Sequence, residues 1–290
     1  MPPHSFKVCG VKYIMKKVST VVFLIVTMVF GLGLLFYPDI GSWRNSRIQS
    51  GLIEEFEERV TGLSDEYIEK HFQKAYEYNK SISGLNIEDP FLVGSGAVFP
   101  PAHYLETLNI GGIMAHISIP AIDVHLPVFH TTATDVLDRG VGHIEGTSLP
   151  VGGVGTHSVL TGHSGLVHAK MFNDLEQIKY GDLFFITVLN RTLAYEVDQI
   201  RTVLPHEVEL VKILDSEDFI TLITCTPYAI NTHRLLVRGT RVEYEVGMEN
   251  KILPREVNSV DWRFVIIGTV AALFTAFIIF QNRKNTGKKS

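Results

Sequence analysis

Cysteine is almost absent from this chain: Cys9 and Cys225 are the only two among 290 residues. Two cysteines cannot form the set of bridges that holds a small secreted domain together. Three histidines lie at His157, His163 and His168, but the sequence lacks the paired-cysteine spacing and the His-Glu-x-x-His helix typical of zinc sites. We therefore expect neither a disulfide scaffold nor a metal site.

The sequence also lacks internal repeats, low-complexity segments and an excess of basic residues. It carries 26 Lys and Arg against 31 Asp and Glu, and residues 1–17 and 281–290 hold eight of the basic residues and no acidic one. The rest of the chain is therefore acidic. A nucleic-acid partner is not expected, because basic side chains must replace the counterions of the phosphates.

Charge is missing from two long apolar runs, residues 18–37 and 264–280. The first is long enough to cross a bilayer, and the second is slightly short. Basic residues precede the first run and follow the second, which predicts cytoplasmic ends at 1–17 and 281–290 and an extracellular middle. A cleaved signal peptide has a shorter apolar core and a small-residue cleavage site, which is missing here. We expect two transmembrane helices and contact with membrane lipid through both.

The whole chain is 46% hydrophobic, which is sufficient for a large core. Residues 38–80 show helical periodicity with a break at Gly62 and Ser64, which predicts two amphipathic helices. Residues 81–103 form a long loop rich in glycine and proline. Within it, Asp89-Pro90-Phe91 could place a large ring and a carboxylate over a groove, although an Asp-Pro pair also makes an ordinary turn.

Short strands separated by turn residues dominate residues 104–250, and residues 251–263 link this domain to the second apolar run. Such a series with little helix indicates a β-sandwich or a closed barrel. We expect Gly239 to end one strand. The predicted strands are 113–119, 124–129, 158–161, 183–189, 192–200, 207–213, 219–225, 234–237 and 241–246.

Cys225 is predicted at the end of a strand, because Pro227 cannot donate a hydrogen bond to a sheet. Arg234 begins the next strand, so the two side chains face each other if these strands pair. A guanidinium beside the thiol would favour the thiolate or stabilise an oxyanion. The more common fate of a lone cysteine is burial as a small apolar residue, and the sequence leaves that alternative open.

His163 is the best candidate for a general acid in the glycine-rich segment 140–165. It follows the strand 158–161 and lies between Gly162 and Gly165, where a side chain can project into a cleft. His157 is expected to make a structural hydrogen bond instead. We do not expect a catalytic role for three further histidines, His143, His168 and His233.

Three segments, in the same order along the chain, resemble the motifs of sortases, the transpeptidases of Gram-positive cell surfaces. Asp89-Pro90-Phe91 and the second apolar run resemble the class C, pilus-assembly sortases, in which an Asp-Pro-aromatic lid covers the active site. The resemblance extends from about residue 45 to 280 and implies a mainly β fold, a closed sortase-type barrel of about eight strands. The segments are Leu160-Thr161-Gly162-His163, Thr221-Leu222-Ile223-Thr224-Cys225 and Asn231-Thr232-His233-Arg234.

The resemblance implies that Cys225 is the nucleophile, His163 the general acid and base, and Arg234 the stabiliser of substrate and oxyanion. The implied enzyme cleaves an LPxTG-like sorting signal between Thr and Gly and transfers the acyl group to a lysine of another pilin. It needs no metal or organic cofactor, and its partners are pilin subunits. Two positions depart from the family pattern: Ser164 replaces an expected arginine, and Ala229 a common glycine.

Three alternatives remain open at this point. A sortase that anchors proteins to peptidoglycan would share all three motifs, and a secreted cysteine hydrolase would share the nucleophile and use water as its acceptor. A membrane-tethered binding module with a buried Cys225 would have no catalytic activity.

Overall fold

The computed structural model describes residues 5–82, 102–166, 168–205, 207, 216–254 and 266–270, with the backbone alone for residues 5–21 and 24. The chain divides into two compact units, one of Met1–Tyr37 with Glu256–Ser290 and one of Pro38–Arg255. The boundary between Tyr37 and Pro38 is the place where the first apolar run was expected to end.

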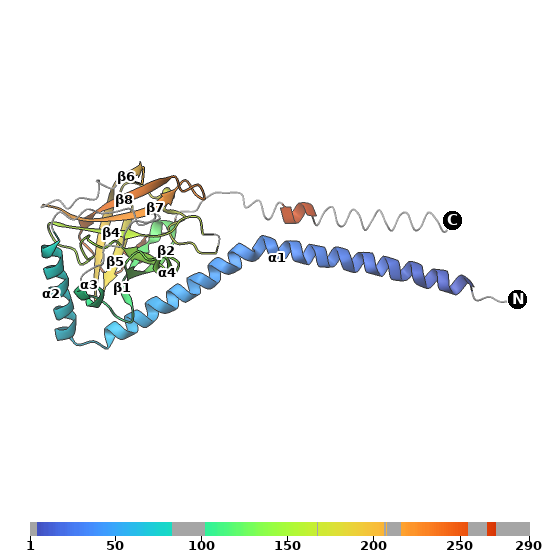
Figure 1. Cartoon of the computed structure of the whole chain (residues 1–290), viewed down its shortest axis with the longest axis horizontal. Coiled ribbons are helices and arrows are strands. Elements are labelled where there is room, and N and C mark those ends of the chain that lie inside the picture. Colours follow the sequence, from blue (N-terminus) through green and yellow to red (C-terminus); the bar gives the residue numbers. More distant parts are fainter. Residues whose placement is uncertain are drawn as a thin grey trace. The chain divides into compact units, whose positions relative to one another are not determined.

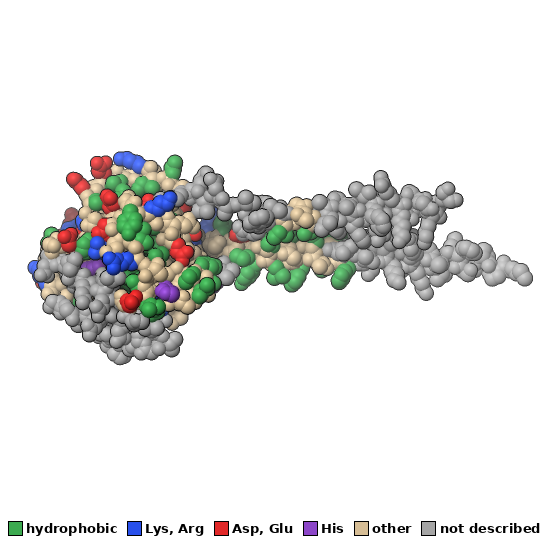
Figure 2. Space-filling model, turned by 90° about the horizontal axis from the view of Figure 1, so that it is seen from above, with side chains coloured by type: hydrophobic (Ala, Val, Ile, Leu, Met, Phe, Trp, Pro, Cys, Tyr) green, Lys and Arg blue, Asp and Glu red, His purple; other side chains and the backbone are tan. Residues whose placement is uncertain are grey.

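Helix α1 (Ser5–Thr61) joins two segments that we expected to be separate helices, and Pro38 lies inside it. A proline removes one backbone hydrogen bond of a helix, which can bend a helix without ending it. Hydrophobic side chains line the exposed surface of α1 (Figure 2), among them Phe23, Phe30 and Tyr37. Within the described residues, this is the one helix long and apolar enough to cross a membrane.

Of the second apolar run, only residues 266–270 belong to the described part, and they are helical. The rest of the predicted span 264–280 lies outside the described residues, as do Asp89, Pro90 and Phe91. The predicted strand 207–213 lies outside them too, apart from Glu207, which is in no strand.

Helix α2 (Asp65–Ser81) confirms the predicted break after α1. Ser64 caps it, because the Ser64 hydroxyl accepts a hydrogen bond from the backbone N–H of Tyr67 at 3.2 Å. Its buried face includes Ile68, Phe72 and Ala75 and joins the main core. The amphipathic pattern therefore identified a helix that packs on the barrel.

The strands gather in one domain beside α2 (Figure 1). They form a closed barrel with the order β1-β2-β3-β4-β7-β8-β6-β5, which confirms the predicted mainly β barrel. In the part of the chain that the structure describes, the short helix α3 precedes the strands, and α4, η1, η2 and η4 connect or follow them. The bounds are α3 Ala102–Glu106, β1 Ile113–Ile119, η1 Pro120–Ile122, β2 Val124–His130, α4 Thr134–Leu137, β3 Val141–His143, β4 Thr156–Thr161, η2 Leu175–Gln177, β5 Leu183–Val188, β6 Arg191–Val203, β7 Asp218–Thr226, β8 His233–Val242 and η4 Glu249–Lys251.

Three strand predictions were wrong, two of them at glycines. The separate strand predicted at 241–246 is absent, because β8 continues to Val242 and residues 243–246 are in no strand. Gly239 does not end a strand but lies within β8, where a Cβ would come 2.4 Å from the ring of Phe184. The glycine is therefore required by close packing inside the barrel. The segment 140–165 was not expected to contain β3, which pairs in parallel with β2. A Cβ on Gly142 would lie 2.4 Å from the carbonyl oxygen of Thr131, so this short strand also needs a glycine.

A buried polar cluster is centred on His143, which is fully enclosed. Its Nε2 lies 2.8 Å from the carbonyl oxygen of Ser148, which can only accept, so Nε2 carries the proton. Nδ1 is therefore the acceptor for the Tyr104 hydroxyl at 2.9 Å. The ring is held neutral, and burial lowers the pKa of His143 to about 3. Burial likewise lowers the pKa of His116 to about 4.

These histidines predict acid lability. The unfolded chain binds a proton at each below pH 6.5, whereas folded His143 does so only near pH 3, so the unfolded state gains more protons as the pH falls. The free energy of unfolding should therefore fall between these pH values by about 1.4 kcal/mol per pH unit for each such histidine. His143→Gln should remove one proton from that slope in urea unfolding of the full chain in detergent. Equal slopes in His143→Gln and in the unmodified protein would contradict the assignment.

Candidate active site

Cys225 and Arg234 face each other across the antiparallel pair β7 and β8, as direct partners in the register. Directly opposed residues of such a pair lie on the same face of the sheet. Both are buried, with 7% of Cys225 and 5% of Arg234 exposed. The predicted strand pairing is confirmed, and it places a permanent positive charge opposite a thiol.

The Arg234 guanidinium is fixed by the backbone beside it. Its Nη1 donates to the carbonyl oxygens of Asn231 at 3.1 Å and His233 at 3.0 Å. The preceding turn is tight, because the N–H groups of Ile230 and Asn231 both donate to the carbonyl oxygen of Pro227 at 3.0 Å. Ala229 in this turn has φ +63°, which explains why a glycine suits that position.

His163 lies beside the end of β7 because β4 and β7 run in parallel, with Thr161 opposite Ile223. The pairing continues past β4: the Gly162 N–H donates to the Ile223 carbonyl oxygen at 3.1 Å, and the Thr224 hydroxyl donates to the Gly162 carbonyl oxygen at 2.7 Å.

On the other side of His163, the Ser164 hydroxyl donates to the carbonyl oxygen of Cys225 at 2.5 Å. Both sequence neighbours of His163 are thus bonded to the segment that ends in the thiol. The tertiary structure brings all three predicted residues, His163, Cys225 and Arg234, to one end of the barrel.

The charge state of His163 is set by two opposed effects. Partial burial lowers the pKa of its imidazole, and the negative charge of Asp138 raises it. Asp138 Oδ1 lies 3.9 Å from Nε2, with 25% of the histidine side chain and 60% of the aspartate side chain exposed. Asp138 follows α4, and no signal in the sequence pointed to it.

The other histidines have structural roles or lie apart. His157 is buried, and its Nε2 lies 2.7 Å from the Thr221 hydroxyl, as expected of a structural hydrogen bond. His143 belongs to the buried polar cluster, and His168 is exposed. His233 pairs with Thr226 in the β7–β8 register, one position beyond Cys225 and Arg234. In the part of the chain that the structure describes, no three His, Cys, Asp or Glu residues gather as metal ligands.

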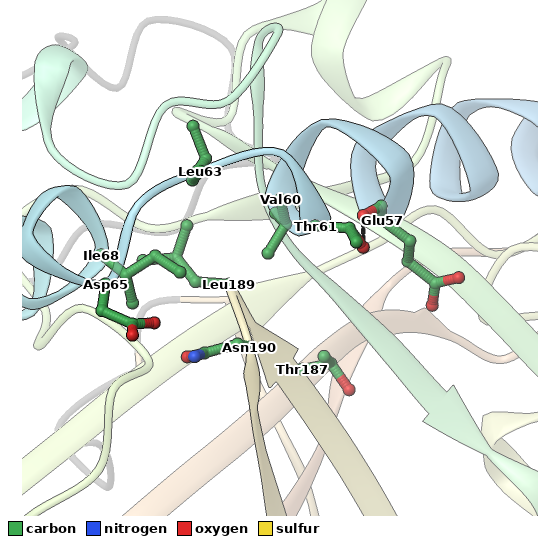
Figure 3. Close-up of a pocket in the computed structure, with 9 residues that line it drawn as sticks. All are labelled: Glu57, Val60, Thr61, Leu63, Asp65, Ile68, Thr187, Leu189 and Asn190. Atoms are coloured by element: carbon green, nitrogen blue, oxygen red, sulfur yellow. Dashed lines mark hydrogen bonds between the residues drawn. The ribbon is translucent and has the colours of Figure 1, made fainter.

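A cavity of about 340 Å³ lies elsewhere, between the α1–α2 turn and the β5–β6 hairpin (Figure 3). Leu189 and Asn190 at the hairpin line it, together with Glu57 and Val60 from α1. The hairpin is at the start of β6, whereas the end of β6 pairs with Arg234 through Val203. The cavity and the Cys225–Arg234 pair are therefore at opposite ends of β6.

Together, the side chains of Cys225, His163 and Arg234 can carry out acyl transfer. A thiolate is a strong nucleophile, a fixed guanidinium can stabilise a tetrahedral oxyanion, and an imidazole can move the proton of a departing or attacking amine.

The position of Asp138 predicts a change in titration. Asp138→Asn removes the negative charge that raises the pKa of His163, so the pKa of His163 should fall further below its ordinary value. NMR titration of the histidine ring protons measures this, and His163→Gln identifies the signal by its loss. Asp135→Asn, in α4 itself, is a control that should leave the His163 titration unchanged. An unchanged titration in Asp138→Asn would show that the carboxylate does not act on the imidazole.

Comparison with known proteins places this geometry in a family. The family model described as "Sortase domain" matches residues 117–242. Sortase C1 of GBS pilus island 1 is 39% identical over 73% of this chain and 97% of its own, with a TM-score of 0.63. Sortase C-1 of Actinomyces oris is 46% identical over 61% of this chain and 99% of its own, with a TM-score of 0.58. Among curated proteins, sortase A of Streptococcus agalactiae is 25% identical over 74% of this chain and 81% of its own length.

The identities are higher with the class C structures than with sortase A, and the class C chains are matched over nearly their whole length. This protein is therefore a cysteine transpeptidase of the sortase family, and it belongs to class C.

Proposed function

We propose that this sortase polymerises pili, using Cys225 as nucleophile, His163 as general acid and base, and Arg234 as stabiliser of the oxyanion. The observation that carries the proposal is the convergence of these three side chains at the ends of β4, β7 and β8 in a class C fold. One relative with this fold is described as the sortase C1 of a pilus island.

In the first half of the reaction, the Cys225 thiolate attacks the threonine carbonyl carbon of an LPxTG-like sorting signal. The carbonyl oxygen becomes an oxyanion opposite the Arg234 guanidinium, where a fixed positive charge is most effective. The Thr–Gly carbon–nitrogen bond then breaks, and His163 gives its proton to the departing amine. A thioester on Cys225 remains.

In the second half, a lysine amine of another pilin attacks the thioester carbon. His163 takes a proton from the amine, the carbon–sulfur bond breaks, and the thiolate is restored. The products are an isopeptide bond and the free enzyme. Two acyl transfers replace one difficult amide exchange, which is the advantage of a covalent nucleophile.

The proposed placement is at the outer face of the cell membrane. The apolar part of α1 anchors the chain, with residues 1–17 and 281–290 in the cytoplasm and a second span at 264–280. Asp89, Pro90 and Phe91 are proposed to form a lid over Cys225. The charge balance supports this orientation, because basic residues cluster at both ends and the middle is acidic.

A peptidoglycan-anchoring sortase is the nearest alternative, because it would share all three motifs. The curated matches include proteins named sortase A. Polymerisation is favoured by the higher identity to class C structures. A hydrolase would transfer the acyl group to water, so a product that depends on the lysine donor separates the two. Membership of a transpeptidase family argues against a binding module.

The nucleophile assignment predicts that Cys225→Ala abolishes polymer formation and leaves the fold intact. Polymer is measured as high-mass ladders from a pilin substrate with its sorting signal and acceptor lysine. Cys9→Ala removes the other cysteine and should leave the ladders unchanged. Persistent ladders in Cys225→Ala would refute the mechanism.

The oxyanion assignment predicts that Arg234→Lys lowers kcat/KM for a sorting-signal peptide by roughly 10²-fold, because an ammonium cannot reproduce the fixed guanidinium fork. Arg238→Lys is the matched control. Arg238 lies on the same strand, bonded to Asp198 at 2.7 Å and away from Cys225. Equal activity of the two variants would count against a role for Arg234 at the oxyanion.

A further inference from the structure

The segment from His163 to Asn173 is held by bonds that the proposed reaction does not yet use. The Phe172 N–H donates to the carbonyl oxygen of His163 at 3.1 Å, which closes the segment into a loop. The ring of Phe172 covers Gly162, where a Cβ would lie 2.9 Å from Cδ2. The backbone on both sides of the His163 ring is therefore fixed.

Asn173 fills the inside of this loop with its amide. Its Oδ1 accepts from the Gly165 N–H at 2.7 Å, and its Nδ2 donates to the carbonyl oxygens of Leu166 at 3.3 Å and Ala169 at 3.1 Å. One side chain thus makes three bonds to the backbone of the loop. These bonds restrict the backbone at Gly165, Leu166 and Ala169, because their polar groups are paired with one fixed amide.

Ser164 connects this loop to the nucleophile. Its hydroxyl donates to the carbonyl oxygen of Cys225 itself, and Ser164 is buried. This is the position at which the family pattern led us to expect an arginine. A serine is short enough to join the two backbones directly, so it fixes the separation between the residue that moves the proton and the residue that attacks.

We propose that Ser164 and Asn173 are positioning residues, which hold the His163 imidazole at the distance from Cys225 that proton transfer to the departing amine requires. The inference rests on the proposed function, since it assigns His163 that proton transfer. A displacement of about 1 Å in such a group can cost about 10²-fold in rate. Neither residue touches the substrate in this proposal.

Ser164→Ala tests the connection. Cleavage of a sorting-signal peptide by the full chain in detergent should lose about 10-fold in kcat, the equivalent of one buried hydrogen bond, with KM within about twofold. Ser164→Thr keeps the hydroxyl and should restore most of kcat. The melting temperature should stay close to that of the unmodified protein, which separates positioning from loss of fold.

Ser158→Ala is the matched control. Ser158 lies on β4 and is also buried, but its hydroxyl has no hydrogen-bond partner among the described residues. The kcat of Ser158→Ala should equal that of the unmodified enzyme. Asn173→Ala, as a second variant, should lower kcat in the same way as Ser164→Ala. A kcat for Ser164→Ala equal to that of Ser158→Ala, or a loss that appears only in KM, would overturn the proposal.

A measurement without substrate separates this proposal from the proposed function. Amide hydrogen exchange at Phe172, whose N–H is bonded to His163, should become about 10-fold faster in Ser164→Ala and stay unchanged in Ser158→Ala. Unchanged exchange at Phe172 overturns positioning, whatever the substrate. Faster exchange in Ser164→Ala supports the connection of the loop to Cys225 through Ser164. If the unmodified enzyme nevertheless does not cleave the peptide, the proposed reaction is refuted instead.

Discussion

The parallel pairing of β4 with β7 is the constraint on which the active site depends. It joins Thr161 to Ile223, two residues that are far apart in the sequence. Two residues beyond each partner, the chain reaches His163 and Cys225. Because parallel strands share one direction, both side chains emerge at the same end of the barrel. A shift of one residue in this register would turn one of the two side chains to the other face.

The antiparallel pairing of β7 with β8 completes the arrangement by setting Arg234 opposite Cys225. The electrostatics of the site follow from these two pairings. The Arg234 guanidinium places a permanent positive charge opposite the thiol, whereas burial disfavours the charged form of the His163 imidazole. Asp138 opposes that effect at 3.9 Å. The barrel therefore fixes the positions of the charges and tunes the proton affinity of His163 through its surroundings.

The polar interior of the domain serves a different purpose. His143 and Tyr104 satisfy each other's hydrogen bonds inside the core, and the neutral state of the imidazole is part of that fit. Asn79 similarly ties α2 to the backbone of Leu149 by two hydrogen bonds. These contacts attach the elements on either side of residues 83–101 to the barrel. Burial of neutral His143 lowers the free energy of unfolding at low pH, because the unfolded chain binds a proton there that the folded chain does not.

Local sequence signals predicted the end of β7 within one residue, at Cys225, and the start of β8 within one residue, at Arg234. They also predicted the break between α1 and α2, because proline, capping serine and apolar periodicity act over a few residues. The motif order also identified the family. Features that depend on residues distant in the sequence became visible only in the folded chain. Gly239 lies inside β8, where the ring of Phe184 leaves no room for a side chain. The strand β3 is too short to be predicted without its neighbours β2 and β4. Asp138, Ser164 and Asn173 carry no local signal, since their roles arise only when the loop after β4 folds against the end of β7.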